Sequence, residues 1–444
     1  MNKVTVIGGG FAGVEAAMQL ARRGIPVELH EMKPVKYSPA HSNENLAELV
    51  CSNSFKATRH GCAAGMLKAE MELFGSLCVE CAKRTAVPAG GALAVDRDKF
   101  SALVTEKINS EPLVEVIRGE VTEIPDGPVI IAAGPLASDA LSEKISELCG
   151  GSLSFFDAAA PIVTAESIDM SRAFCQSRYD RGEPDDYINC PLNKEEYEAF
   201  YERLVNAEVA VTHGFDKRKG VYEGCMPIEV MASRGKDTIR FGPMKPAGLV
   251  DPRTGHRPWA NLQLRKENTA ATMYNLVGFQ TNLKFGEQKA VFSMIPALAG
   301  AEFVRYGVMH RNTFINSPTV LGSDYRMLTR ENLWFAGQIT GVEGYMESAG
   351  SGIVAGVNAA RYMLGKGPVE LPAESMLGAL ASYVHTAEAS TFQPMGASFG
   401  LLPPAETKIR DKKERYEALC ERGLSALEEA LRLQGELSEK DGTK

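Results

Sequence analysis

A chain of 444 residues with 44% hydrophobic and 23% charged residues has the composition of an ordinary globular protein, long enough for two or three domains. It contains no apolar run of about 18 residues, so we expect no membrane-spanning helix, and the first apolar run is too short and glycine-rich for a secretory signal. The net charge of −8 excludes a surface that is basic throughout, and nine cysteines without regular spacing indicate reduced thiols in the cytoplasm.

The first predicted elements are a strand, a glycine-rich turn and a helix. Residues 4–7 form a short apolar run, typical of a parallel strand that is covered on both faces. In a turn of this type the first glycine makes the bend, the second lets a pyrophosphate approach and the third lets the helix pack on the strand. We therefore expect a dinucleotide to contact the residues of the turn, which are Gly8, Gly9, Gly10, Phe11, Ala12 and Gly13.

A second predicted strand, residues 26–30, leads to Glu31, which stands eighteen residues beyond Gly13. An acid at that position accepts hydrogen bonds from both hydroxyls of an adenosine ribose without a 2′-phosphate. A GxGxxG motif alone also occurs in turns that bind nothing. Here strand, turn, helix, second strand and acid follow in register within about thirty residues, and we interpret them as a dinucleotide-binding unit.

The next segment combines a long loop with a cysteine. Residues 33–45 are polar, contain prolines and are too many for a simple strand-to-helix connection, which predicts a functional lid. Cys51 follows, and three small polar residues come after it. This setting is typical of a thiol at the edge of a site, and a buried structural thiol is the alternative.

A predicted helix over residues 66–84 carries Cys78 and Cys81. Their spacing occurs in redox pairs and in half-sites for metals, and His60 and Cys62 upstream extend the second possibility. The spacing fits no zinc module, and no strand precedes the pair. We interpret both cysteines as packing residues and predict no metal site.

The middle of the chain contains a strand that returns to the first sheet and then a change of character. Residues 129–131 end in small residues and a turn, as expected for a strand beside a cofactor. From about residue 165 to 276 the chain is richer in aromatic and charged residues and shows no alternation of strands and helices, which predicts an inserted α+β domain. Cys225 lies there between Gly224 and Pro227, in a turn where a catalytic and a structural thiol are equally compatible with the local sequence.

Parallel-sheet character resumes at residues 333–338, followed by a glycine-rich helix start. FAD spans more distance than one strand–helix–strand unit covers, and its flavin end needs a second cradle of backbone groups. A nicotinamide dehydrogenase needs no such late element. We therefore expect FAD, and the second group of predicted contacts is Gly337, Gln338, Gly350, Gly352 and Ile353.

The predicted fold is thus an α/β, Rossmann-like FAD-binding fold of the glutathione-reductase type with an inserted α+β domain. We assign residues 1–165 to the first part of the FAD-binding domain, 166–276 to the inserted domain, and 277–444 to the second part, which ends in a helical tail.

Seven stretches in one order, over nearly the whole chain, make a more specific pattern than any dinucleotide motif. They are GGGFAG, AHSNENLAELVCSNSFK, VPAGGALAVDR, YEGCMPIE, GFQTNLKFGEQKAVF, EFVRYGVMHRNTFINSP and LWFAGQITGVEGYMESAGSGI. In these stretches the chain resembles the bacterial folate- and FAD-dependent tRNA (uracil-5-)-methyltransferases, the TrmFO family, which is related to the GidA flavoproteins.

The resemblance implies a reaction: methylation of carbon 5 of the T-loop uridine of tRNA (position 54), giving 5-methyluridine. Methylenetetrahydrofolate would provide the carbon, FAD would carry and reduce it, and NADH or NADPH would regenerate the flavin. The chemistry needs a nucleophilic thiol and a proton-transfer group. The resemblance gives the first role to Cys225 of the GCMP motif and the second to Cys51 of the LVCSNS motif.

Further expectations follow from the resemblance. The predicted folate pocket includes residues 305–316, with His310 and Arg311, and Tyr345, which are core or surface residues in the alternative interpretation. No second strand–GxGxxG–helix is present for a nicotinamide nucleotide, which we expect to visit the flavin transiently, and we predict no stable protein partner. Two basic clusters, residues 217–219 and 408–415, are either tRNA contacts or solvated faces. The target uridine must turn out of its loop to reach the nucleophile.

Three other functions stay open on the residues alone. One is that of the related, larger FAD protein that modifies wobble uridines of tRNA and carries a long additional C-terminal helical region, for which this chain is too short. Another is a flavin thiol–disulfide oxidoreductase that uses Cys78 and Cys81. The third is a flavoprotein that binds RNA without catalysis, in which the cysteines of the two turns have no role.

Overall fold

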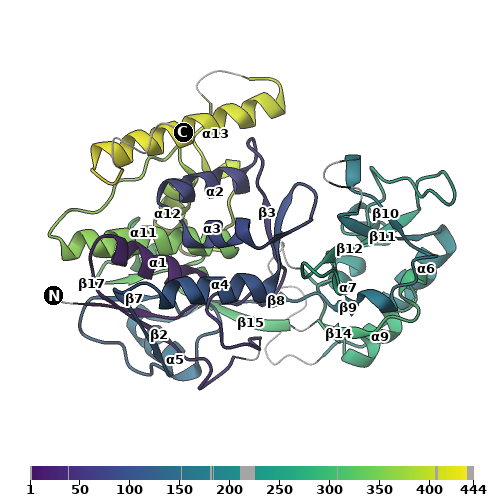
Figure 1. The fold of residues 1–444 in the computed structure, drawn as a ribbon, viewed down its shortest axis with the longest axis horizontal. Coiled ribbons are helices and arrows are strands. Elements are labelled where there is room, and N and C mark those ends of the chain that lie inside the picture. The colour runs from purple at the N-terminus through teal and green to yellow at the C-terminus, as the bar shows by residue number, and fades with distance from the viewer. Residues whose placement is uncertain are drawn as a thin grey trace.

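The computed structural model describes residues 3–38, 40–151, 153–180, 183, 185–210, 226–307, 309–405 and 409–437, without the side chains of residues 153–158, 180 and 309–311. Two lobes are visible in Figure 1, joined by the antiparallel strands β8 (Leu153–Ala158) and β15 (Met309–Phe314). Among the helices of these described ranges, none has the length and apolarity needed to cross a membrane.

The first lobe is built on a six-stranded sheet in the order β16-β17-β7-β1-β2-β6. All neighbouring strands pair in parallel except the edge strand β16. The strands are β1 (Val4–Ile7), β2 (Val27–Glu31), β6 (Val114–Arg118), β7 (Val129–Ile131), β16 (Arg326–Met327) and β17 (Arg330–Phe335). The order reverses between β1 and β7, which is where open α/β sheets bind ligands. The predicted α/β, Rossmann-like fold is confirmed.

Two helices cross at close range over this sheet. They are α1 (Phe11–Arg22) and α11 (Tyr345–Met363). A Cβ at Gly352 would overlap the carbonyl oxygen of Ala12, and one at Gly356 would lie 2.7 Å from that of Ala16. The two glycines are therefore what lets the helices approach.

Further helices cover the first lobe. They are α2 (Ala63–Leu73), α3 (Leu77–Arg84), α4 (Arg97–Asn109), α5 (Asp139–Cys149), α10 (Ser317–Val320), α12 (Met376–Thr386) and α13 (Lys412–Leu433). The tail helix α13 packs over α2 (Figure 1), in agreement with the predicted amphipathic tail. The predicted helix over 66–84 is wrong in one respect, because Gly75 takes a positive φ of 67° and Ser76 then caps a new helix through its side chain.

The second lobe contains an antiparallel sheet in the order β10-β11-β12-β13-β9-β14, with a core of its own around Phe200, Phe279 and Phe292. Its strands are β9 (Ile162–Thr164), β10 (Phe174–Cys175), β11 (Tyr187–Leu192), β12 (Ala260–Lys266), β13 (Met273–Leu276) and β14 (Phe303–Arg305). Its helices are α6 (Lys194–Val205), α7 (Ile228–Ser233), α8 (Thr238–Phe241) and α9 (Phe285–Phe292).

The second lobe extends beyond the predicted boundaries at 166 and 276. Strand β9 lies before the first boundary, and α9 and β14 lie after the second. Strand β9 pairs with both β13 and β14, which closes the antiparallel sheet where the chain enters and leaves the lobe. Strands of three residues carry no readable periodicity, so the sequence pattern did not reveal them.

A small antiparallel sheet, β3-β5-β4, lies beside the main sheet and carries the chain on from the Cys51 segment. Its strands are β3 (Ser54–Ala57), β4 (Ala86–Val87) and β5 (Ala92–Val95). Residues 119–124, which follow β6, form no strand. The pairing of β6 with β2 ends at Arg118, and Gly119 takes a φ of 158°.

Candidate active site

A cavity opens at the point where the strand order of the main sheet reverses. The glycine turn after β1, the ends of β2 and β7, and the segment after β17 line it. Gly8 has a φ of 107°, and a Cβ there would lie 2.5 Å from the carbonyl oxygen of Ala132. Gly10 has nothing within 4 Å of a Cβ position, whereas a Cβ at Gly13 would overlap the Gly8 carbonyl oxygen. The turn therefore has the geometry expected of a GxGxxG turn that binds a pyrophosphate.

The amino end of α1 is a ready site for an anion. The residue before the helix is Gly10, and no side chain caps the first backbone N–H groups. Unpaired N–H groups at a helix N-terminus attract phosphate through hydrogen bonds and the helix dipole. Phe11 and Ala12 also line the cavity.

Glu31 ends β2 at the rim of the same cavity and is buried. One carboxylate oxygen, Oε2, accepts a hydrogen bond from the backbone N–H of Gly9 at 2.9 Å. The other, Oε1, accepts one from the N–H of Lys33 at 2.9 Å. The two bonds fix the plane of the carboxylate against the glycine turn, where sequence reasoning placed it.

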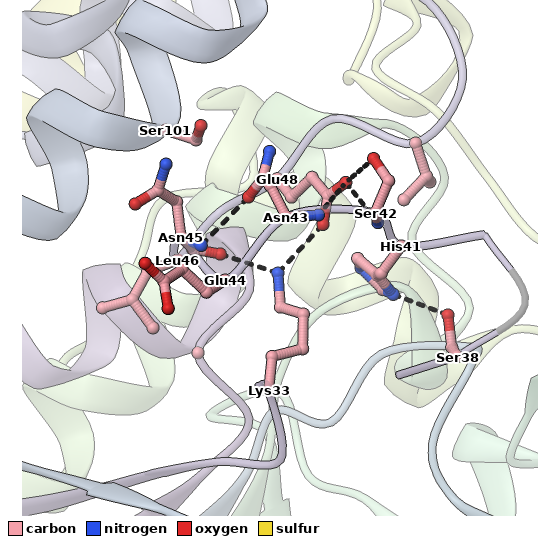
Figure 2. Close-up of polar contacts among 12 residues, drawn as sticks. Lys33, Ser38, His41, Ser42, Asn43, Glu44, Asn45, Leu46, Glu48 and Ser101 are labelled. Atoms are coloured by element: carbon pink, nitrogen blue, oxygen red, sulfur yellow. Dashed lines mark hydrogen bonds and ion pairs between the residues drawn. The ribbon is translucent and has the colours of Figure 1, made fainter. Parts of the chain in front are cut away.

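The loop of residues 33–45 folds around a buried ion pair (Figure 2). Lys33 Nζ lies 3.0 Å from Glu48 Oε2, and both side chains are nearly inaccessible. Glu48 Oε1 accepts hydrogen bonds from the N–H and the hydroxyl of Ser42 at 2.7 and 2.8 Å. Burial alone would raise the pKa of Glu48, but Lys33 and the Ser42 donors hold it below its ordinary value. Lys33, His41 and Glu48 line the cavity, so the loop forms one wall of it.

The second group of predicted cofactor contacts divides in two. Gly337 and Gln338 line the cavity. Gly350, Gly352 and Ile353 do not line it. They lie inside α11, where Gly350 faces Leu377, Gly352 faces α1 and Ile353 is fully buried in the core. The residues of α11 that reach the cavity are Tyr345 and Ser348 of its first turn. Sequence reasoning missed Ser348, Lys33, His41 and Glu48.

Tyr345 connects the cavity to Cys51. Its ring stacks near Phe11, with the ring centroids 4.7 Å apart. Its hydroxyl oxygen accepts hydrogen bonds from the backbone N–H groups of Val50 and Cys51 at 3.0 and 2.9 Å, and lies 3.1 Å from Cys51 Sγ. Because a phenol oxygen has two lone pairs, both now occupied, its own proton points to the sulfur. Tyr345 thus donates a hydrogen bond to the sulfur of Cys51.

Arginines from both lobes hold the backbone on the other side of Cys51. Arg97, at the start of α4, donates to the carbonyl oxygens of Leu49 (2.8 Å) and Cys51 and is paired with Glu267. Arg305 of β14 donates to the carbonyl oxygen of Val50 at 2.8 Å.

The residues after Cys51 are held from β12. Arg265 donates to Ser52 Oγ at 2.8 Å and to Asn53 Oδ1 at 2.9 Å. The side chain of Asn53 in turn donates to the carbonyl oxygens of Val95 and Lys266 at 3.0 and 2.9 Å. Sequence reasoning missed Arg97 and Arg265, although Arg97 stands within a quoted stretch. Arg305 begins the stretch predicted for the folate pocket, and here it binds the backbone beside Cys51.

Cys225 lies outside the described residues, as do residues 217–219 and Lys408. The chain just after Cys225 is described. Pro227 precedes α7, and Glu229 accepts hydrogen bonds from Thr281 Oγ1 and the N–H of Asn282, each at 2.8 Å. Two of the quoted stretches, YEGCMPIE and GFQTNLKFGEQKAVF, therefore meet in space.

The remaining predicted site residues lie on β15 and at the tail. The backbone of β15 places His310 opposite Asp157 and Arg311 opposite Phe156. The side chains of His310 and Arg311 are outside the description. In the tail cluster, Lys413 Nζ lies 3.8 Å from a carboxylate oxygen of Glu417 on the same helix.

Cys78 and Cys81 are fully buried on α3, and both are free thiols. Burial raises the pKa of Cys78 well above its usual value and that of Cys81 to about 12. Thiols of this kind are unreactive, as the packing interpretation predicts. Within the described parts of the chain, no group of three or more potential ligands is arranged to hold a metal ion.

Comparison with known proteins identifies relatives along the whole chain. The family model named glucose inhibited division protein A matches residues 3–367. The methylenetetrahydrofolate--tRNA-(uracil-5-)-methyltransferase TrmFO of Enterococcus faecalis is 58% identical over 424 residues, which are 95% of this chain and 97% of that protein. The protein of the same name from Acetivibrio thermocellus is 58% identical over 431 residues, 97% of this chain and 98% of that protein.

Among solved structures, Aquifex aeolicus GidA in its form I crystal is similar at a TM-score of 0.69 and 18% sequence identity, covering 99% of this chain and 76% of that chain. This likeness concerns the fold. The identity to the curated relatives over nearly their full length, together with the match to the family model, shows that the chain belongs to the TrmFO family of methylenetetrahydrofolate--tRNA-(uracil-5-)-methyltransferases, which is related to GidA.

Proposed function

We propose that this protein methylates carbon 5 of the T-loop uridine at position 54 of tRNA, with methylenetetrahydrofolate as carbon donor, FAD as redox cofactor and NADH or NADPH as reductant. The observation that carries the proposal is the position of Cys51. Its sulfur accepts a hydrogen bond from Tyr345, a residue that lines the dinucleotide cavity. A thiol bonded to a residue of such a cavity suits the chemistry that the names of the relatives imply.

The residues of the cavity fit FAD. The open backbone at Gly10 and the uncapped N-terminus of α1 suit the pyrophosphate, and the Glu31 carboxylate suits the adenosine ribose. Gly337 and Tyr345 lie where the flavin end would be held. When bound and reduced, FAD supplies the two electrons that convert a methylene group to a methyl group, and a nicotinamide nucleotide restores them.

The two cysteines divide the work on the pyrimidine. Carbon 5 of uracil is a poor nucleophile until a thiolate adds to carbon 6. In this proposal Cys225 forms that bond, and the resulting enolate attacks the one-carbon unit through carbon 5. Cys51 then removes the proton from carbon 5, and the electron pair of that bond expels the carrier nitrogen from the one-carbon unit, which leaves a methylene group on carbon 5. Two electrons and a proton, added as hydride, reduce this group to methyl and expel Cys225 from carbon 6. The hydrogen bond from Tyr345 holds the sulfur of Cys51 in place for this step.

The test is to incubate the purified protein with unmodified tRNA, labelled methylenetetrahydrofolate and NADPH, and to map the modified base by mass spectrometry. We expect labelled 5-methyluridine in the T-loop and none without folate. Cys225→Ala and Cys51→Ala should retain FAD and form no product. Cys62→Ala is the matched control, because this thiol is half-buried and does not line the cavity.

Two results would contradict the proposal. A modified wobble base with an unchanged T-loop would identify the activity of the larger relative. Normal methylation by Cys225→Ala would remove the assigned nucleophile, while normal methylation by Cys51→Ala would remove the assigned base.

A further inference from the structure

The second lobe contains a hollow that the proposed chemistry does not use. It lies between the start of α6 and the segment before β12, and its lining includes Lys194, Arg240, Arg257 and Trp259. The guanidinium carbon of Arg240 lies 3.9 Å from the centre of the Trp259 ring, and Lys194 Nζ lies 5.7 Å from it. Trp259 nevertheless remains 37% exposed. A large aromatic ring is therefore presented to solvent with cations beside it.

The charges in the hollow are mainly positive. Arg253 is neutralised by Asp251, with an N–O distance of 2.7 Å. Lys194 and Arg257 are exposed, and neither has an ion-pair partner among the described residues. The chain as a whole carries −8, so this group of cations stands out against an acidic background. A second exposed aromatic ring, Phe241 at 67%, lies 5.1 Å from the Arg240 guanidinium.

Exposed aromatic rings with unpaired cations are the combination that binds RNA. Unstacked bases stack on aromatic side chains and on guanidinium planes, while lysines and arginines neutralise the phosphates. A ligand that is only anionic would leave the exposed indole ring unused. The hollow suits one base and its neighbouring phosphates.

The distance to the catalytic thiol fits a single RNA molecule. Trp259 immediately precedes β12, and Arg265 near the other end of β12 holds Ser52 beside Cys51. Six residues of extended strand at about 3.3 Å each separate the two ends by about 20 Å. Successive stacked nucleotides of one strand lie about 3.4 Å apart, so about six nucleotides span the distance between the two ends of β12.

We propose that this hollow is a second tRNA contact, in which Trp259 stacks on an unpaired base and Lys194 and Arg257 bind phosphates. The inference rests on the proposed function, because it takes tRNA as the substrate. It assigns RNA contacts to the second lobe, in addition to the basic clusters that the sequence indicates.

The test measures tRNA affinity of the FAD-loaded protein as a function of salt. Trp259→Ala should weaken binding about 5- to 160-fold, as expected for the loss of one stacked base. The double variant Lys194→Ala/Arg257→Ala should lower the slope of log affinity against log salt by about 1.4 to 1.8. Both residues are exposed, so this variant keeps its fold if the Trp259 variant does not. Lys366→Ala, an exposed lysine of the first lobe, is the matched control and should change neither quantity.

A second readout separates this proposal from the proposed function. Reduction of the flavin by NADPH needs no tRNA and should be equal in all variants. Unchanged tRNA affinity and salt slope in both hollow variants would overturn the inference, even if the wild type methylates tRNA. Loss of binding of a free mononucleotide without loss of tRNA affinity would overturn it too, since the hollow would then hold a small anion. A wild type that does not methylate tRNA would refute the proposed function instead.

Discussion

Tyr345→Phe should separate the packing role of this ring from the role of its hydroxyl. Phenylalanine keeps the contacts with Phe11 and Phe55, whose ring centroids lie 4.7 and 5.7 Å away. It removes an oxygen that takes part in three hydrogen bonds, two of them from backbone N–H groups of Val50 and Cys51. At about 0.5–1.5 kcal/mol net for each bond, we expect the free energy of unfolding to fall by about 2–4 kcal/mol.

The same change should alter the pH profile of the reactivity of the Cys51 thiol, because it removes the hydroxyl that donates to the sulfur. The assay is the rate of alkylation of Cys51 by iodoacetamide at a series of pH values, followed by mass spectrometry. Cys62 in the same chain is the internal reference and should keep its profile. An unchanged midpoint at Cys51 in a folded variant would refute the assigned direction of the hydrogen bond.

Three further substitutions test the framework around the site. Gly352→Ala forces α1 and α11 apart, so it should lower the free energy of unfolding by about 1–3 kcal/mol and weaken FAD binding. Its control, Gly286→Ala, lies in open space on α9 and should raise the free energy of unfolding by up to about 1 kcal/mol. Urea unfolding measures both variants. Lys33→Met leaves Glu48 buried without its cation and should cost about 3–5 kcal/mol near neutral pH. The pKa of Glu48 is lower in the folded protein than in the unfolded chain. The stabilisation by the ion pair is therefore present above the unfolded pKa and is lost as pH falls through the folded pKa. The free energies of unfolding of wild type and variant should converge in acid. Cys81→Ser should methylate tRNA as the wild type does, because Cys81 is buried and unreactive. Neither the wild type nor this variant should reduce disulfides.

The parallel sheet could be predicted because its information is local. The apolar run of β1 is followed directly by the glycine turn, and the acid at the end of β2 is fixed by the parallel register of the two strands. Helix α1 has the expected length because Gly24 follows it with a φ of 76°. The edges of the second lobe could not be predicted, since β9 and β14 are short and are defined by their pairing across about 140 residues.

Glycines that face a ligand and glycines that face a helix look alike in a sequence. Gly10 opens onto the cavity, whereas Gly352 and Gly356 face the backbone of Ala12 and Ala16. A signal was available, because two glycines four residues apart lie on one side of a helix and indicate close helix packing. The arginines around Cys51 had no such signal, since they bind backbone carbonyl groups far away in the chain.

The contacts of Cys51 indicate which catalytic step each of the two proposed thiols performs. Its own N–H and carbonyl groups are both bonded, the first to Tyr345 and the second to Arg97, and Arg305 binds the residue before it. A side chain on a backbone held from both lobes keeps one position. Proton transfer requires a group at hydrogen-bond distance from a defined proton, and a fixed thiol satisfies that geometry.

A nucleophile faces a different requirement, because its sulfur must approach carbon 6 to bonding distance and then withdraw. The hydrogen bond from Tyr345 also holds the sulfur of Cys51 itself. A strongly held sulfur with a hydrogen-bond donor aimed at it is suited to removing a proton and less suited to forming a transient carbon–sulfur bond. The contacts of Cys51 therefore support its assignment as the base and leave the nucleophilic step to Cys225.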